Sequence, residues 1–274
     1  FKTIKTNIKS KDQVFDLIRN LNETADIYLA LQHPEDELWN GEPEIKKSLK
    51  ELKLFQIRQT NSLFLSSWNN LKTDEFRKLV KICSIISFRY NIIGGLNPNA
   101  QEEVYNTVAL NIAANKVYSP NDFQNIYVND FNFENAFSTK EFKSTSRNHK
   151  IVKYILSKIE TYQHRNDIDP DSDLFTLEHI LPENADESWG EFTFEEINRS
   201  VYKIGNLTLL EKKLNREAGQ KSYVEKKNYL LESKSKLTQI IPENYETWNE
   251  DKISARQREL AKHAKAIWRI QELS

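Results

Sequence analysis

The chain has few of the residues that make turns and cross-links. Its 274 residues include only 6 glycines, 7 prolines and one cysteine, and no methionine. So few glycines and prolines argue against a turn-rich all-β fold. A single cysteine, Cys83, cannot build a disulfide framework, which is typical of proteins in a reducing compartment such as the cytoplasm. Cys83 lies in an apolar helical pattern, so we expect it to be a small core residue.

Long apolar runs and a net charge are missing too. No segment approaches the length of a membrane span and no signal peptide is visible, so we expect no membrane partner. The net charge of −1 predicts no partner, but its distribution is uneven. Residues 167–196 hold eleven acidic side chains and no Lys or Arg, whereas residues 199–236 hold ten basic and four acidic ones. Each block by itself is most often a solvated face.

Apolar residues recur at helical spacing through the first 165 residues. Ser10 to Gln13 has the form of a capping box, and the stripe that follows it consists of Val14, Leu17, Ile18, Leu21, Ala25 and Tyr28. Thr73 is expected to cap a second helix. Residues 101–117 and 149–162 are typical of two more helices. This part of the chain therefore predicts a helical region.

The pattern changes after an acidic, turn-rich linker at residues 167–173. Two short apolar segments, 174–182 and 204–210, are typical of strands. A short helical turn is expected between them, at 194–198. A helix at 222–233 and a last long helix capped by Asn249 are expected to follow. The second part of the chain therefore mixes strand and helix.

One of the expected strands carries an unusual pair of polar residues. Glu178 and His179 lie inside the apolar sequence Leu177–Pro182, LEHILP. Taken alone, the pair is more typical of a surface strand. Two asparagines change that interpretation: Asn206 lies in the second strand, and Asn215 follows nine residues later in a basic segment.

With these residues the chain resembles the HNH nucleases, and more narrowly the HNH domain at the C-terminus of GmrSD-type restriction proteins. Those are type IV, modification-dependent proteins of anti-phage defence. The resemblance covers about residues 170–235 and rests on Leu177–Pro182, Trp189, Tyr202–Leu210, Asn215 and Lys221. It implies a ββα-metal (His-Me finger) core of two antiparallel strands and a helix. The expected fold is thus mainly α with a small α+β part: a helical linker and scaffold at 1–165, then a nuclease domain at 166–274 that helices wrap and a C-terminal helix ends.

The resemblance also assigns roles to the polar residues. His179 is implied as the general base that takes a proton from water, and Glu178 as a metal ligand. Asn206 is implied to brace the loop that carries His179. Asn215 stands where many relatives place a histidine ligand, so the ligands are oxygen-rich and suit Mg²⁺ or Mn²⁺. Because neighbours on a flat strand point to opposite faces, Glu178 and His179 can share an ion only if the strand twists or ends there.

The resemblance implies DNA as the partner, and this gives the basic segment a role. Lys213, Arg216 and Lys221 are expected to bind its phosphates, whereas Lys226 and Lys227 are interpreted as ordinary surface lysines. The resemblance implies a nucleotide-dependent sensor domain that precedes the nuclease. Because the chain starts at Phe1 and not at Met, we expect that domain to lie outside this sequence.

The sequence leaves more than one function open. The leading hypothesis is a metal-dependent HNH endonuclease or nickase in a restriction protein of the bacterial cytoplasm. The alternative is a catalytically inactive helical module, for DNA binding or protein interaction, that keeps an HNH remnant. RNA is a further possible substrate, since the same chemistry cleaves either backbone. The sequence does not reveal the recognised modification, or whether one or both strands are cut.

Overall fold

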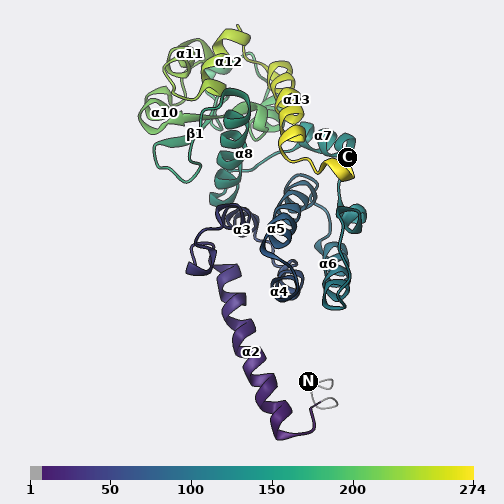
Figure 1. The fold of residues 1–274 in the computed structure, drawn as a ribbon. Helices are drawn as coiled ribbons and strands as arrows, with labels where there is room; N and C mark the ends of the chain where they lie inside the picture. The colour runs from purple at the N-terminus through teal and green to yellow at the C-terminus, as the bar shows by residue number, and fades with distance from the viewer. Residues whose placement is uncertain (1–7) are drawn as a thin grey trace. The chain divides into compact units, whose positions relative to one another are not determined.

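The computed structural model describes residues 8–274, which form two compact units (Figure 1). The N-terminal unit extends to Asn91 and resumes from Leu96 to Tyr127, and the C-terminal unit comprises Ile92–Gly95 and Val128–Glu272. These units are defined by packing. The boundary that the sequence predicts between residues 165 and 166 lies where the composition changes. It divides the expected scaffold from the expected nuclease domain, and it stays a prediction. Within the described residues, no helix is both long enough and apolar enough to cross a bilayer.

The N-terminal unit is helical, as its periodicity predicts. Ser10 does form the expected capping box, because its side chain accepts from the Gln13 amide at 3.2 Å and the Gln13 side chain accepts from the Ser10 amide at 3.1 Å. The prediction for Thr73 is wrong by one residue, since Lys72 is the cap and Thr73 begins the helix. The elements are α2 (Lys11–Gln32), η1 (Glu37–Trp39), α3 (Pro43–Phe55), α4 (Asn61–Asn70), α5 (Thr73–Ser87), the π-helix η2 (Phe88–Ile93), α6 (Pro98–Ala113) and η3 (Pro120–Ile126).

Aromatic rings fill the core of this unit. Trp39 stacks on Phe76 with 6.3 Å between ring centroids, and Phe64 meets the edge of Phe76 at 5.9 Å. Cys83 is fully buried on α5, as expected. Burial raises the pKa of its thiol well above the ordinary range.

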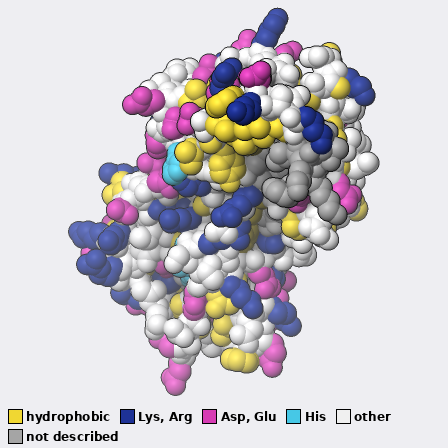
Figure 2. Space-filling view, turned by 90° about the horizontal axis from the view of Figure 1, so that it is seen from below, with side chains coloured by type: hydrophobic (Ala, Val, Ile, Leu, Met, Phe, Trp, Pro, Cys, Tyr) yellow, Lys and Arg dark blue, Asp and Glu magenta, His cyan; other side chains and the backbone are white. Residues whose placement is uncertain are grey.

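The apolar stripe of α2 does not lie in this core. Val14, Ile18, Leu21 and Tyr28 are 41–55% exposed, and Phe15 is 64% exposed. Figure 2 shows a patch of hydrophobic side chains on the face that is seen from below, and further ones scattered over it. The helical spacing of the apolar residues thus predicted the helix correctly, but the apolar face that it defines is exposed in the structure.

The C-terminal unit contains the only two strands among the described residues, surrounded by helices (Figure 1). This confirms a mainly helical fold with a small β part. The elements are α7 (Asp130–Thr139), α8 (Ser146–His164), β1 (Phe175–His179), η4 (Glu187–Trp189), α9 (Phe194–Ser200), η5 (Ile204–Asn206), β2 (Leu207–Glu211), α10 (Lys212–Ala218), α11 (Tyr223–Leu231), α12 (Lys236–Asn244) and α13 (Glu250–Ile267), and a last turn η6 (Gln271–Leu273).

The two strands pair antiparallel over their full length. Phe175 lies opposite Glu211 and His179 lies opposite Leu207. Both strands are shorter than the apolar segments that predicted them, because residues 204–206 form a 3₁₀ turn and β1 ends at His179. The Ile180 amide still donates to the Asn206 carbonyl at 3.0 Å. The end of β1 is therefore held directly beside the turn that precedes β2.

Helix α13 fixes this turn. The Arg256 guanidinium donates to the carbonyls of Gly205 and Leu207 at 2.8 Å each, and the Gln257 side chain accepts from the Gly205 amide at 3.0 Å. A Cβ at Gly205 would lie 2.1 Å from the Ile253 carbonyl oxygen, so only glycine fits at this contact. The predicted cap of α13 is also present, since the Asn249 side chain accepts from the Lys252 amide at 3.0 Å.

Candidate functional site

The end of β1 directs two reactive side chains toward different neighbours. Glu178 is 5% exposed, and its Oε1 lies 2.5 Å from Lys226 Nζ on α11. The imidazole of the next residue, His179, faces Glu183, whose Oε1 is 3.4 Å from His179 Nε2. The two side chains thus take different directions, as neighbours on a strand do, but β1 ends at His179, which is the condition under which the pair could serve one ion.

Lys226 is not the surface lysine that the sequence suggested. It is fully buried, and its ammonium donates both to Glu178 and, at 2.8 Å, to the His179 carbonyl. The interpretation of Lys226 as a solvated helix residue is therefore wrong. A buried ammonium requires a partner, and here the partner is a carboxylate 48 residues earlier in the chain.

Burial acts on both members of this pair. It raises the pKa of Glu178 to about 7, and the attraction and hydrogen bond of Lys226 offset part of that effect. It also lowers the pKa of Lys226, against the attraction of Glu178. The two shifts have one cause, since burial disfavours the charged form of each group, while the 2.5 Å contact between them favours the ion pair.

The imidazole of His179 is neutral at physiological pH. Burial lowers its pKa to about 4, while the nearby Glu183 carboxylate acts in the opposite direction. The contact with Glu183 is therefore not an ion pair at pH 7. Among the described residues, Nε2 of His179 has no hydrogen-bond partner although it is buried. A neutral ring with an unpartnered nitrogen has the form that accepts a proton.

Glu183 belongs to a polar cluster that the motif did not include. Its Oε1 accepts from the Ser144 hydroxyl, and Tyr202 bonds to the same carboxylate, which together with burial raises the pKa of Tyr202. The Tyr202 ring also meets His179 edge-on, with 6.4 Å between ring centroids. The signal for Glu183 was its position four residues after His179, but nothing in the sequence linked either residue to Ser144.

Asn206 bonds to the backbone of the segment that follows His179. Its side chain accepts from the Leu181 amide at 2.8 Å and donates to the Leu181 carbonyl, also at 2.8 Å. Trp248 donates its ring N–H to the same Asn206 oxygen at 3.1 Å. The residues after His179 are therefore clamped to the turn before β2. Trp189 and Trp248 are both buried, as expected for core aromatics.

Asn215 reaches the other side of β1 from helix α10. Its Nδ2 donates to the Leu177 carbonyl at 3.1 Å, so its amide lies beside the residue that precedes Glu178. Three of the predicted residues thus lie at the end of β1. Glu178 and His179 are its last two residues, and Asn215 bonds to its backbone.

The predicted phosphate-binding residues lie on the surface around α10. Lys213 has a side chain that is 86% exposed, and its nearest acidic group is Glu217 at 4.0 Å. Arg216 is exposed on the same helix. Lys221 is exposed and donates to the Glu217 carbonyl. All three are accessible to a ligand, and their role stays a prediction.

The oxygen donors at the strand end fit a hard divalent ion. Glu178 offers a carboxylate and Asn215 an amide oxygen, which are groups that suit Mg²⁺ or Mn²⁺. No group of three His, Cys, Asp or Glu side chains within residues 8–274 could hold a metal. Two protein donors leave most of the coordination to water and phosphate, which is how Mg²⁺ is usually bound.

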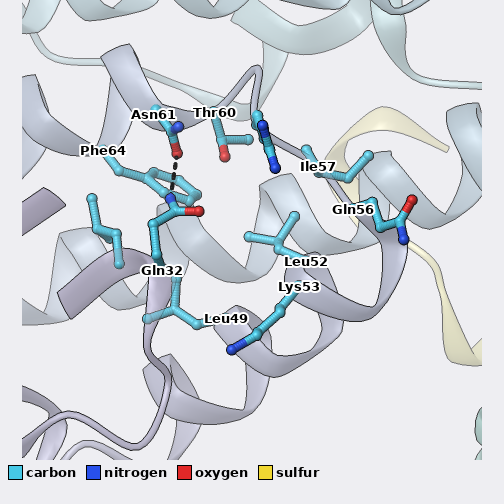
Figure 3. Close-up of a pocket in the computed structure, with 11 residues that line it drawn as sticks. Gln32, Leu49, Leu52, Lys53, Gln56, Ile57, Thr60, Asn61 and Phe64 are labelled. Carbon is cyan, nitrogen blue, oxygen red and sulfur yellow. Dashed lines mark hydrogen bonds between the residues drawn. The ribbon is translucent and has the colours of Figure 1, made fainter. Parts of the chain in front are cut away.

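A cavity of about 490 Å³ in the N-terminal unit is a separate feature (Figure 3). It lies where the ends of α2 and α3 meet the start of α4, and Gln32 donates to Asn61 across it at 3.2 Å. Leu49, Leu52 and Phe64 form its apolar wall. None of the predicted site residues lines it.

Comparison with known proteins identifies a family over the part of the chain that contains these residues. Residues 127–263, half of the chain, match a family model described as the C-terminal domain of GmrSD restriction endonucleases. The match includes both strands and every residue of the predicted site. A search of curated proteins found no match.

Proposed function

Because the chain belongs to the family of GmrSD restriction endonuclease C-terminal domains, we propose that it is a metal-dependent DNA endonuclease or nickase of the HNH type. The family itself indicates a nuclease role in restriction. The observation that carries the finer proposal is the half-buried His179 at the end of β1, whose imidazole is neutral and whose buried Nε2 has no partner among the described residues. The order β1, β2, α10 along the chain, with Asn215 on the helix, supports the proposal of a ββα core.

His179 acts as the general base in this proposal. Hydrolysis of a phosphodiester needs a positioned water and a group that accepts its proton near neutral pH. The Asn206 clamp on Leu181 fixes the backbone just after His179, and the Lys226 bond to the His179 carbonyl fixes it from the other side. Glu183 lies within reach of the ring and stabilises its protonated form once the proton has arrived.

Glu178 and Asn215 would hold Mg²⁺ or Mn²⁺. Such an ion neutralises charge on the phosphate oxygens during cleavage. Lys213, Arg216 and Lys221 bind neighbouring phosphates and orient the backbone. Cleavage then leaves 5′-phosphate and 3′-hydroxyl ends. In the cell the chain acts as the effector part of a bacterial cytoplasmic restriction protein, under a nucleotide-dependent sensor domain that precedes it.

A plasmid-nicking assay with Mg²⁺ or Mn²⁺ tests this function. We expect His179→Ala to lower the cleavage rate at least about 100-fold, the range typical of losing a general base. His33→Ala, at an exposed histidine of the N-terminal unit, is the matched control and should cleave at the wild-type rate. Equal rates for the wild type and His179→Ala would reject the mechanism. Competition between DNA and RNA of one sequence identifies the substrate.

The ion pair of Glu178 with Lys226 favours a second candidate. A carboxylate that already has a buried cation partner is also what an inactive HNH remnant would keep for stability. Such a protein would bind DNA but no metal. Calorimetry with millimolar Mn²⁺ in the presence of DNA separates the two, because only the nuclease shows metal-dependent heat.

A further inference from the structure

The charge on the metal-binding side of the site is already balanced inside the protein. Lys226 Nζ lies 2.5 Å from Glu178 Oε1, and both side chains are buried. Asn215, the second proposed ligand, is neutral. The two donors together with Lys226 therefore offer an incoming divalent ion oxygen atoms but no net negative charge.

Binding of a divalent cation at such a site is opposed by electrostatic repulsion. Lys226 repels a second cation on the same carboxylate, and the repulsion is only weakly screened because the pair is removed from water. Lys226 cannot simply swing into solvent, since its ammonium also donates to the His179 carbonyl and its side chain passes over the Trp189 ring, 6.0 Å from the centroid.

The missing negative charge can come from a phosphodiester. Helix α10 carries Asn215, and the exposed cations Lys213 and Arg216 lie on the same seven-residue helix. DNA that these cations bind places phosphate oxygens near the Asn215 amide. Each phosphate adds one negative charge and further oxygen donors, which offsets the repulsion from Lys226.

We infer that Lys226 makes metal binding depend on nucleic acid: the protein alone binds the divalent ion weakly, and the bound phosphate backbone completes the site. This rests on the proposed function, because it assumes the ion held by Glu178 and Asn215. Lys226 is then a positioning residue that touches neither water nor phosphate. It prevents the free protein from carrying a loaded metal centre.

The first test uses a chain in which both Glu178 and Lys226 are kept. Mn²⁺ is titrated by calorimetry into the His179→Ala chain, which keeps the duplex intact, alone and with a short DNA duplex, with duplex-only blanks subtracted. We expect Mn²⁺ affinity to rise about tenfold or more with DNA, a coupling of ordinary size. A duplex with neutral methylphosphonate linkages should give no such gain. By linkage, Mn²⁺ must tighten DNA binding by the same factor.

Variants then assign the effect to Lys226. Lys226→Gln keeps a hydrogen-bond donor for Glu178 and removes the charge, and Lys226→Met removes both. We expect Lys226→Gln to bind Mn²⁺ more tightly than the parent chain without DNA, and to gain much less from DNA. Lys227→Met is the matched control, because Lys227 is its half-buried neighbour and lies over Tyr223 instead. A thermal melt of each variant checks that it folds.

The outcomes separate this inference from the proposed function. Tight Mn²⁺ binding by the parent chain without DNA overturns the inference and leaves the nuclease proposal standing. Unchanged Mn²⁺ affinity in a folded Lys226→Gln chain also overturns it, and reduces Lys226 to a structural ion pair. Absence of Mn²⁺ binding in every chain, with or without DNA, rejects the metal site itself.

Discussion

At the scale of single residues, burial decides the protonation of the site. His179 and Glu178 are neighbours, yet burial moves their pKa values in opposite directions, to about 4 and about 7. Both shifts have the same physical cause, because a low-dielectric environment disfavours whichever form is charged. The imidazole is thereby kept in its neutral form, which is the form of a base, over the whole physiological range.

The pKa of His179 predicts a pH-dependent contribution to stability. Since the folded value of about 4 lies below the ordinary 6.5, the unfolded chain binds a proton first as the pH falls. The wild type should lose about 3 kcal/mol of unfolding free energy between pH 6.5 and pH 4 through this one group. Urea unfolding of the wild type and His179→Gln across this range measures the difference.

The two chains must be compared because Glu178 changes the unfolding free energy with pH in the opposite direction. Its raised pKa favours the fold at low pH and disfavours it as the pH rises through about 7. Both chains keep Glu178, so its effect cancels in the difference. A difference between the wild type and His179→Gln that stays constant from pH 4 to pH 7 would contradict the lowered pKa of this imidazole.

The residue types of the site were predictable, but their partners were not. A carboxylate and an imidazole in an apolar strand, with two later asparagines, were enough to select Glu178, His179, Asn206 and Asn215. Lys226 was missed because a Lys-Lys pair on a helix is most often solvated. Only the folded chain reveals which of the two lysines turns inward to Glu178.

At the scale of elements, the site depends on how α13 holds the 3₁₀ turn of residues 204–206. Arg256 and Gln257 satisfy the backbone of this turn, and Asn206 at its end holds the segment after β1. Helix α13 therefore positions His179 without touching it. The turn is the mechanical link between the C-terminal helix and the proposed base.

Gly205→Ala tests this link. Its new methyl group would lie 2.1 Å from the Ile253 carbonyl oxygen, so α13 or the turn must move. We expect a loss of about 1–3 kcal/mol, the usual cost of overpacking, measured by urea unfolding. Gly190→Ala is the control. Its methyl group would lie 3.2 Å from a backbone oxygen, a much milder contact than the one at Gly205, so the loss of stability should be smaller. Equal stability of Gly205→Ala and wild type would show that the turn adapts freely.

Elements were easier to predict than their packing. Helix α8 extends two or three residues beyond each end of the segment that predicted it, and α13 begins directly after the predicted cap Asn249. Strand ends were less predictable, since the apolar pattern at 204–206 is satisfied equally by a buried 3₁₀ turn. The exposed stripe of α2 is a further case, because amphipathic spacing specifies a face and not what covers it.

At the scale of the whole molecule, a net charge near zero conceals a basic surface. The exposed cations Lys213, Arg216 and Lys221 lie on or just after α10, next to the predicted ligand Asn215. Binding of a polyanion to such a surface depends on salt, because each neutralised phosphate releases condensed counterions. The average composition could not have revealed this surface, but the order of charges along the chain did.

This surface predicts a salt dependence of DNA affinity. Replacing the three cations with alanine should flatten the slope of log affinity against log salt concentration by about 2.7, since each phosphate contact contributes about 0.9. Fluorescence anisotropy with one labelled duplex at several salt concentrations measures both slopes. A control with three other exposed lysines changed to alanine, Lys47, Lys78 and Lys81, should keep the original slope. Equal flattening in both would mean that DNA binds without a preferred face.

The single cysteine has a practical consequence for such measurements. Cys83 is fully buried in α5 and its thiol is held in the protonated form, so in the folded chain no thiolate is available to attack a maleimide reagent. Any cysteine introduced at an exposed position becomes the sole labelling point. A spin label or fluorophore can therefore be attached at will, and distances between a labelled position and bound Mn²⁺ can be followed without first removing the natural sulfur.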